Sequence, residues 1–136
     1  MLIDFHTHAF PEKIAQKAIE KLSFASGGLT PHTNGTFFDL KRLLATSKID
    51  KAVVLSIATN AAQQKNVNNF AASINDGENI FAFGSVFPDA PDALYELERI
   101  KSLGLKGVKL HPDYQGFSAD DQKMKPIYKK SVNWGL

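Results

Sequence analysis

The sequence predicts an α/β fold with a parallel sheet, and three observations lead to this fold class. Short runs of apolar, β-branched and aromatic residues alternate with longer segments of helical periodicity, and turn residues separate the two kinds of segment. Strands that alternate with helices form parallel sheets, because parallel neighbours need a crossover connection. Four segments are predicted strands: Leu2 to His8, Lys51 to Ala58, Ile80 to Phe87 and Gly107 to His111.

Five segments have the spacing of amphipathic helices, with apolar residues recurring at intervals of three and four. They are Glu12 to Phe24, Phe37 to Ser47, Ala61 to Asn75, Asp92 to Leu103 and about Lys123 to Trp134. The resulting order contains about four βα units, and a complete (β/α)8 barrel has eight in about 250 residues. We therefore expect a single domain over residues 1–136, with the architecture of the first half of a TIM barrel.

The composition is that of an ordinary globular domain, with 43% hydrophobic and 22% charged residues. The net charge is only +2 and the lysines are scattered along helical segments, so nothing indicates nucleic-acid binding. The chain has no cysteine, so a bound metal would need His, Asp or Glu ligands. Neither a signal peptide nor a membrane-length apolar segment is recognisable, and the expected location is the cytoplasm.

The first predicted strand carries Asp4, His6 and His8 at alternate positions. Strand side chains change face at every residue, so we expect these three to point into the barrel lumen, with Ile3 and Phe5 against the helices. Two imidazoles on one face can bind one divalent ion, and barrel active sites lie at the carboxyl ends of the strands. His6 and His8 are predicted metal ligands. Asp4 is predicted to lie behind them, as a structural carboxylate or a further ligand.

The same alternation applies to the fourth predicted strand. It places Lys109 and His111 on one face and Val108 and Leu110 on the other, with His111 at the rim. Pro112 follows and ends strand pairing because it has no N–H group. His111 is therefore either a functional residue at the mouth of the site or a rim histidine hydrogen-bonded to a loop.

Several segments together resemble the amidohydrolase-related family, the branch that includes aminocarboxymuconate semialdehyde decarboxylase and related hydrolases. The likeness spans essentially the whole chain. The His-x-His element is shared by many branches of the superfamily, whereas its combination with Lys109-Leu110-His111-Pro112 is more specific. The segments that carry the resemblance are Asp4 to Pro11, Ile49 to Val54, Gly107 to Pro112 and Tyr114 to Phe117.

The resemblance implies a metal-dependent barrel in which the His-x-His pair joins a histidine from the fifth strand and an aspartate from the eighth. His6 and His8 match the first two ligands, and the other two have no counterpart in this chain. His111 lies where other branches place a bridging ligand, so it is either a ligand or a substrate contact. Zinc is the expected metal, with manganese, iron and nickel as alternatives. The implied reaction on a small molecule is hydrolysis of a C–N or C–O bond through a metal-activated water, or decarboxylation of an unsaturated or aromatic acid.

Three further residues are candidates for substrate binding. Lys109 is either a substrate contact or the counterion of Asp4 across the lumen, since a buried ammonium group needs a partner. His32 lies in the Gly- and Pro-containing loop from Ser23 to Gly35, which we expect to cover the site. Phe10 follows the His-x-His strand directly and is expected to line an apolar pocket.

Half of a barrel would expose strand edges and an apolar face, so a partner is expected. It would be either a second copy, whose first strand takes the place beside the fourth strand, or a missing C-terminal half. Two other functions compete with the amidohydrolase. A polymerase-and-histidinol-phosphatase-like phosphoesterase also begins with His-x-His, although Ala9-Phe10-Pro11 argues against it. The second is a non-catalytic half-barrel that serves as a binding or assembly module.

Overall fold

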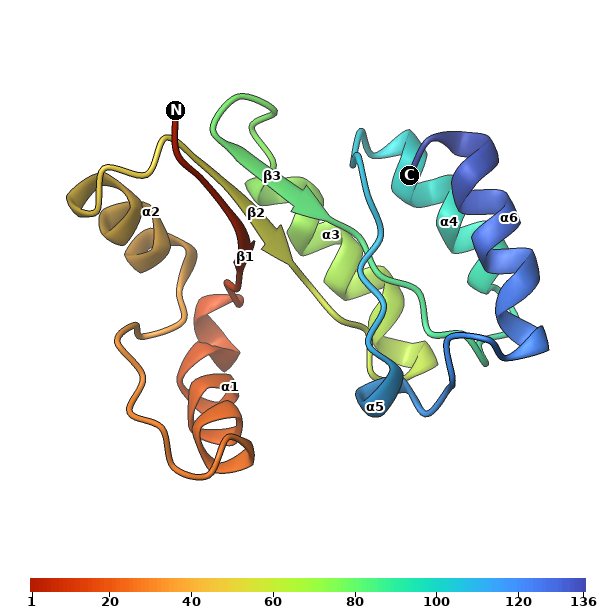
Figure 1. Cartoon of the computed structure of the whole chain (residues 1–136), viewed down its shortest axis with the longest axis horizontal. Coiled ribbons are helices and arrows are strands. Elements are labelled where there is room, and N and C mark those ends of the chain that lie inside the picture. The colour runs from red at the N-terminus through yellow and green to blue at the C-terminus, as the bar shows by residue number, and fades with distance from the viewer.

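A parallel sheet of three strands, in the order β1-β2-β3, forms the centre of the protein (Figure 1). The computed structural model describes all of residues 1–136. The strands are β1 Ile3–Thr7, β2 Lys51–Leu55 and β3 Ile80–Phe83. Ala52 to Leu55 pair in unbroken register with Ile80 to Phe83. The α/β class with parallel strands alternating with helices is therefore confirmed.

The helices begin and end within a few residues of their predicted bounds. Between β1 and β2 lie α1 (Glu12–Ala25) and α2 (Phe37–Thr46), and between β2 and β3 lie the 3-10 turn η1 (Ala61–Gln63) and α3 (Gln64–Ile74). Thr36 caps α2 by accepting a hydrogen bond from the N–H of Asp39. After β3 come α4 (Ala93–Ser102), the short α5 (Pro112–Gln115), the 3-10 turn η2 (Gln122–Met124) and α6 (Lys125–Trp134). None of these helices is long and apolar enough to cross a membrane.

The fourth predicted strand is present only as an isolated bridge, in which Val108 pairs with Gly84 in parallel. Two hydrogen bonds hold it: Gly84 N–H donates to the Gly107 carbonyl at 2.9 Å, and Lys109 N–H donates to the Gly84 carbonyl at 2.7 Å. The prediction of a strand over 107–111 was therefore wrong in extent. After this bridge the backbone bonds to side chains: the Lys109 carbonyl accepts from the Ser85 hydroxyl, and the His111 N–H donates to the Gln115 side chain.

One face of the sheet packs against the helices and forms the hydrophobic core. Alternate residues of β2 and β3, which include Ala52 and Ala82, point to this side. Their neighbours in the core come from the buried faces of α2, α3, α4 and α6. They include Leu40, Leu44, Ala71, Ile74, Leu97, Ile100 and Ile127.

The opposite face of the sheet is uncovered. Ile3 and Phe5 lie on this side with Val53 and Phe83, and they expose 45% and 64% of their surface. The rings of Phe5 and Phe83 meet edge to face at 6.1 Å. The expectation that Ile3 and Phe5 pack against the helices was therefore wrong. In a closed barrel this uncovered face would be the lumen side.

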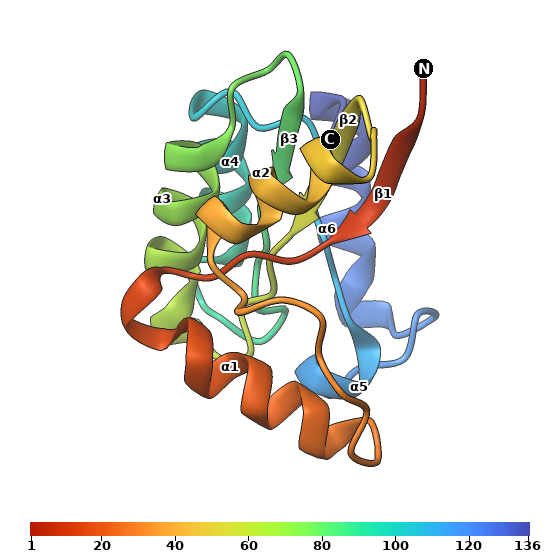
Figure 2. The same ribbon diagram turned by 90° about the vertical axis from the view of Figure 1, so that its left-hand side faces the viewer.

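All three strands run in the same direction, so their carboxyl ends meet at one edge of the sheet. In both views α1 and α5 lie at that end, which is the lower end in Figures 1 and 2. The residues that follow β1, and those that precede α5, are therefore brought to the same end of the molecule. This is where the functional residues of parallel α/β folds gather.

Candidate functional site

The histidine pair follows an irregularity in β1. Asp4 pairs with Ala52, but Thr7 pairs with Val54, so β1 has one residue more than β2 between these two pairs. This is a β-bulge, which often re-aims side chains beside active sites. The bulge puts both Asp4 and Thr7 on the helix side of the sheet, although strict alternation would separate them. The predicted Asp-His-His face therefore does not exist as such, because Asp4 lies on the other side from His8.

Two hydrogen bonds fix the backbone around the bulge. The Thr7 hydroxyl is buried and donates to the Val53 carbonyl at 2.9 Å. The Asp4 carboxylate accepts from the His6 N–H at 3.1 Å. The Asp4 carboxylate thus binds the backbone of its own strand. It forms no ion pair with Lys109, contrary to the expected pairing across the lumen.

The rings of His6 and His8 lie side by side at the end of β1, with centroids 5.0 Å apart and planes at 68°. The Nδ1 atom of His8 is 2.8 Å from the Leu55 carbonyl oxygen. A carbonyl can only accept, so Nδ1 carries the proton and the Nε2 lone pair is free. Metal-binding histidines are commonly held by such a hydrogen bond through the second ring nitrogen.

The electrostatics keep His8 neutral. Burial lowers the pKa of His8 below its ordinary value of 6.5, and the positive charges of His6, Lys109 and His111 lower it further, while the hydrogen bond to Leu55 opposes them. A neutral imidazole is the form that binds a metal. Lys109 and His111 are among the titratable groups near His8.

His111 is held in place at the start of α5. Its side chain caps this helix, with Nδ1 3.5 Å from the Tyr114 N–H, and its ring stacks on the Tyr114 ring at 4.3 Å. Its backbone N–H donates to the Gln115 side chain at 2.8 Å. Gln115 is itself buried and donates to the carbonyls of Ala58 and Val86, both at 2.8 Å. One glutamine thus joins the segments that follow β2 and β3 to His111.

A buried polar network holds the backbone next to Lys109. The Ser85 hydroxyl donates to the Lys109 carbonyl at 2.9 Å and accepts from the Ala58 N–H at 3.0 Å. The amide of Asn68, which is fully buried on α3, binds both the N–H and the carbonyl of Ser85 and donates to Glu96 at 2.7 Å. This network replaces the ladder of hydrogen bonds that a full fourth strand would have provided.

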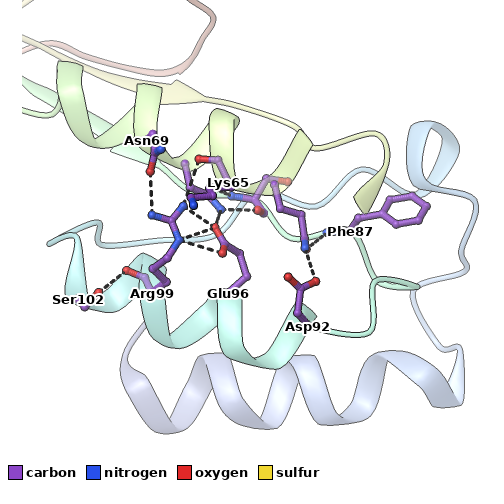
Figure 3. Close-up of polar contacts among 10 residues, drawn as sticks. Lys65, Asn69, Phe87, Asp92, Glu96, Arg99 and Ser102 are labelled. Carbon is purple, nitrogen blue, oxygen red and sulfur yellow. Dashed lines mark hydrogen bonds and ion pairs between the residues drawn. The ribbon is translucent and has the colours of Figure 1, made fainter. Parts of the chain in front are cut away.

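The outer part of this network joins α3 to α4 (Figure 3). Glu96 is almost fully buried on α4 and forms an ion pair with Arg99 at 2.7 Å. The guanidinium of Arg99 reaches across to α3, where it donates to the Asn69 side chain at 2.8 Å and to the Lys65 carbonyl at 3.2 Å. The hydrogen bonds that Arg99 donates to Glu96 raise the pKa of Arg99.

A groove of about 380 Å³ opens beside His8, between α1, the loop after it and Tyr114. Its other lining residues are mostly apolar or small and include Ile19, Leu22 and Leu29. Of the three candidates for substrate binding, none lines this groove. His32 is exposed on the loop, next to the lining residue Pro31. Phe10 is half-buried, and its N–H donates to the Gly35 carbonyl at 2.8 Å, which ties β1 to the loop. Their contact with a substrate stays a prediction.

The residues present fit two ligands of a metal ion. His6 and His8 lie side by side, and the hydrogen bond of His8 uses Nδ1 and leaves Nε2 available. No three His, Asp or Glu side chains come together closely enough to hold a metal. The predicted role of His111 as a third ligand therefore stays a prediction, and this chain by itself completes no coordination shell.

Sequence reasoning missed the residues that position the site, above all Asn68, Ser85 and Gln115. One signal was available for Asn68. On α3 the buried positions are Gln64, Asn68, Ala71 and Ile74, so two amides occupy the start of the apolar face. Polar side chains at core positions indicate a buried network that needs partners. Ser85 is a polar residue within the run Ile80 to Phe87, which was interpreted only as a strand, and Gln115 lies outside every predicted helix and strand.

Comparison with known proteins assigns the chain to a family. An amidohydrolase family model matches residues 3–136, which is nearly the whole chain. The chain belongs to the amidohydrolase family. No match was found among curated proteins.

A solved structure confirms the fold. The chain is similar to the crystal structure of 4-oxalomesaconate hydratase, LigJ, from Rhodopseudomonas palustris, with a TM-score of 0.64 and 18% sequence identity. The match covers 98% of this chain and 50% of that chain. The chain thus spans about half the length of this TIM-barrel relative, which supports the predicted half-barrel architecture.

Proposed function

We propose that His6 and His8 are the first two ligands of a divalent metal, with zinc as the expected ion, in an amidohydrolase site that acts on a small molecule. The single observation that carries the proposal is the pairing of the two imidazoles at the carboxyl end of β1, with His8 fixed by Leu55. Manganese, iron and nickel also suit imidazole ligands. A metal bound here would lower the pKa of a water molecule and polarise a carbonyl group.

The side chains around the pair suit a substrate with a carboxylate group. Lys109 and His111 lie near His8, and no Asp or Glu forms an ion pair with any of the three. Lys109 would therefore orient a negatively charged substrate group towards the metal side of the site. The apolar side of the groove, from α1 and its following loop, would take the uncharged part of the substrate.

The proposed reaction is hydrolysis of a C–N or C–O bond, or decarboxylation of an unsaturated or aromatic acid. Because the structural neighbour is named a hydratase, addition of water to a conjugated double bond belongs in the same tests. The family membership supports this proposal over the phosphoesterase alternative. The chain would act with a partner, because two histidines alone leave the coordination shell of a zinc ion incomplete.

Zinc binding tests the proposal directly. We expect isothermal titration of the purified, metal-free chain with zinc to show a site that His6→Ala and His8→Ala each weaken by at least about tenfold, since the loss of a residue that only orients a ligand already costs this much. The matched control is His32→Ala, an exposed histidine on a loop, which should bind zinc like the parent chain. Equal affinity in all four proteins would refute the proposal.

Turnover separates a catalyst from a non-catalytic module. The zinc-loaded chain should hydrolyse an activated ester or amide, or change the ultraviolet absorbance of a conjugated dicarboxylic acid, and His6→Ala should abolish this activity. Zinc binding at His6 and His8 without turnover on any of these compounds would instead favour the binding module.

A further inference from the structure

Two stacked aromatic rings on α5 border the site. The rings of His111 and Tyr114 lie 4.3 Å apart, with 16° between their planes. His111 is the N-cap of α5 and Tyr114 is its third residue, so a single helical turn brings the two side chains together. Pro112 sets the backbone angle at the first helical position, and Gly116 ends the turn with a φ of 66°. The stacked pair is therefore held at both ends of α5.

Tyr114 connects this pair to the groove that contains His8. Its side chain is 47% exposed and lines the groove together with residues of α1 and the following loop, such as Leu22 and Leu29. In Figure 2, α5 lies at the same end of the molecule as α1. The Tyr114 ring is the largest flat surface among the lining residues. A molecule bound beside His8 would therefore meet this ring.

The hydrogen bonds of the two imidazoles assign them different roles. Nδ1 of His8 faces the Leu55 carbonyl, so Nδ1 carries the proton and the Nε2 lone pair is available to a metal. Nδ1 of His111 instead faces the Tyr114 N–H at 3.5 Å and accepts from it, so the proton of the neutral ring is on Nε2. A nitrogen that keeps its proton donates a hydrogen bond and does not bind a metal. His111 therefore offers a donor, and His8 offers a lone pair.

A capping role alone does not require an imidazole at position 111. Asn, Asp, Ser and Thr are the preferred N-cap residues, and each would accept from the Tyr114 N–H. The imidazole adds a flat face against Tyr114 and an N–H group on Nε2. Lys109 and His111 are both near His8, and neither forms an ion pair with a carboxylate. An N–H donor beside a lysine without an acidic partner suits an anionic group.

We propose that His111 is a substrate-binding residue and not a metal ligand, and that it acts together with Tyr114. The Nε2–H of His111 donates to an oxygen of a carboxylate, and the Tyr114 ring packs against the flat group that carries this carboxylate. Flat rings pack on each other more favourably than their buried area alone provides. This inference rests on the proposed function because it concerns the same site, but the contacts that it names need no metal.

Benzoate tests the donor, because it joins a carboxylate to a flat ring. We expect NMR titration of the metal-free chain to show benzoate binding that His111→Asn weakens by at least about tenfold, since hydrogen bonds to charged groups are worth this much. Asparagine is a good N-cap residue, so this variant keeps the cap of α5 and removes the imidazole. Absence of benzoate binding, or equal affinity in His111→Asn, would overturn the proposal.

Cyclohexanecarboxylate tests the ring contact, because it has the same carboxylate on a group that is not flat. The parent chain should bind benzoate at least about threefold more tightly than cyclohexanecarboxylate. Tyr114→Phe should keep this preference and Tyr114→Leu should lose it. The matched control is Tyr95→Leu on α4, where the side chain is 65% exposed and does not line the groove, and the preference should persist. The same preference in Tyr114→Leu as in the parent chain would contradict the contact.

Imidazole nitrogen shifts separate this inference from the proposed metal site. Heteronuclear NMR spectra are recorded at about pH 8, where free imidazole is neutral, before and after addition of zinc. Zinc should shift Nε2 of His8 and leave His111 with its proton on Nε2. A comparable zinc-induced shift at a His111 nitrogen would overturn the role given to His111 and leave the metal site intact. No shift at His8, with benzoate binding still dependent on His111, would refute the metal site alone.

Discussion

Replacing Asn68 with alanine should lower the stability of the fold much more than replacing the neighbouring Asn69 on the same helix. The Asn68 amide accepts from the Ser85 N–H at 2.8 Å and donates to the Ser85 carbonyl at 2.9 Å. Both groups of Ser85 are buried, and the substitution would leave each without a partner. A buried backbone group without a partner costs about 1–3 kcal/mol, so Asn68→Ala should lower the free energy of unfolding by about 2–6 kcal/mol.

Asn69 provides the matched control. It is the next residue of the same helix, so the change in helix propensity on replacement with alanine is the same. Its side chain is exposed and accepts one hydrogen bond from Arg99 at 2.8 Å. Asn69→Ala should therefore change the free energy of unfolding by no more than about 0.5 kcal/mol.

Urea denaturation followed by far-ultraviolet circular dichroism measures both variants. Hydrogen exchange adds a local readout, because the Lys109 N–H is bonded to Gly84 beside the network and should exchange faster in Asn68→Ala. Similar stabilities of Asn68→Ala and Asn69→Ala would refute the view that the network holds the segment before α5 in place of a fourth strand.

Three further results are expected. The pKa of His8 is lowered in the folded chain, so its contribution to stability is present above pH 6.5 and is lost as the pH falls through the folded pKa. The urea midpoint should therefore fall less between pH 7 and pH 5 in His8→Gln than in the parent or in His32→Gln. The same pH dependence of the midpoint in all three proteins would contradict the burial of His8. Thr36→Ala removes the cap of α2 and should cost about 1 kcal/mol of stability, measured by thermal unfolding, whereas no loss would show that the cap is not used. A Cβ atom at Gly84 would lie 2.7 Å from the buried Ile100 side chain, so Gly84→Ala should cost about 1–3 kcal/mol in the same assay. A neutral effect would mean that the Ile100 side chain can move aside without loss of packing.

The helices and the first three strands could be predicted because their signals are local. The apolar spacing over α1, α3 and α4 defines one buried face for each helix, and the observed bounds agree with it within a few residues. The runs that became β2 and β3 are continuous and apolar, as expected for parallel strands inside an α/β protein.

The bulge in β1 could not be predicted, since no glycine or proline marks it. Strict alternation predicted Ile3 and Phe5 on the helix side, and the register shift after Asp4 is the reason that alternation fails. The prediction that the side chains of His6 and His8 are neighbours was nevertheless correct, because both residues lie at the end of β1.

The reduced fourth strand depends on long-range contacts that no local pattern contains. The run before Pro112 has the composition of a strand, but its backbone groups find partners in Ser85 and Gln115, which lie far away in the sequence or beyond the proline. Side-chain hydrogen bonds compete with ladder pairing in this way when a strand has only one neighbour. For the same reason the sequence predicted His111 at the rim but did not predict the side chains that hold it in place.

X-ray absorption at the zinc edge tests the central claim most directly, because it reports the ligands of the metal themselves. For the zinc-loaded chain we predict nitrogen neighbours at about 2.0–2.1 Å with the outer-shell scattering of at least two imidazole rings, and loss of one ring in His8→Ala. A spectrum without imidazole scattering, or one that is identical in His8→Ala, would contradict the assignment of His6 and His8 as the metal-binding pair.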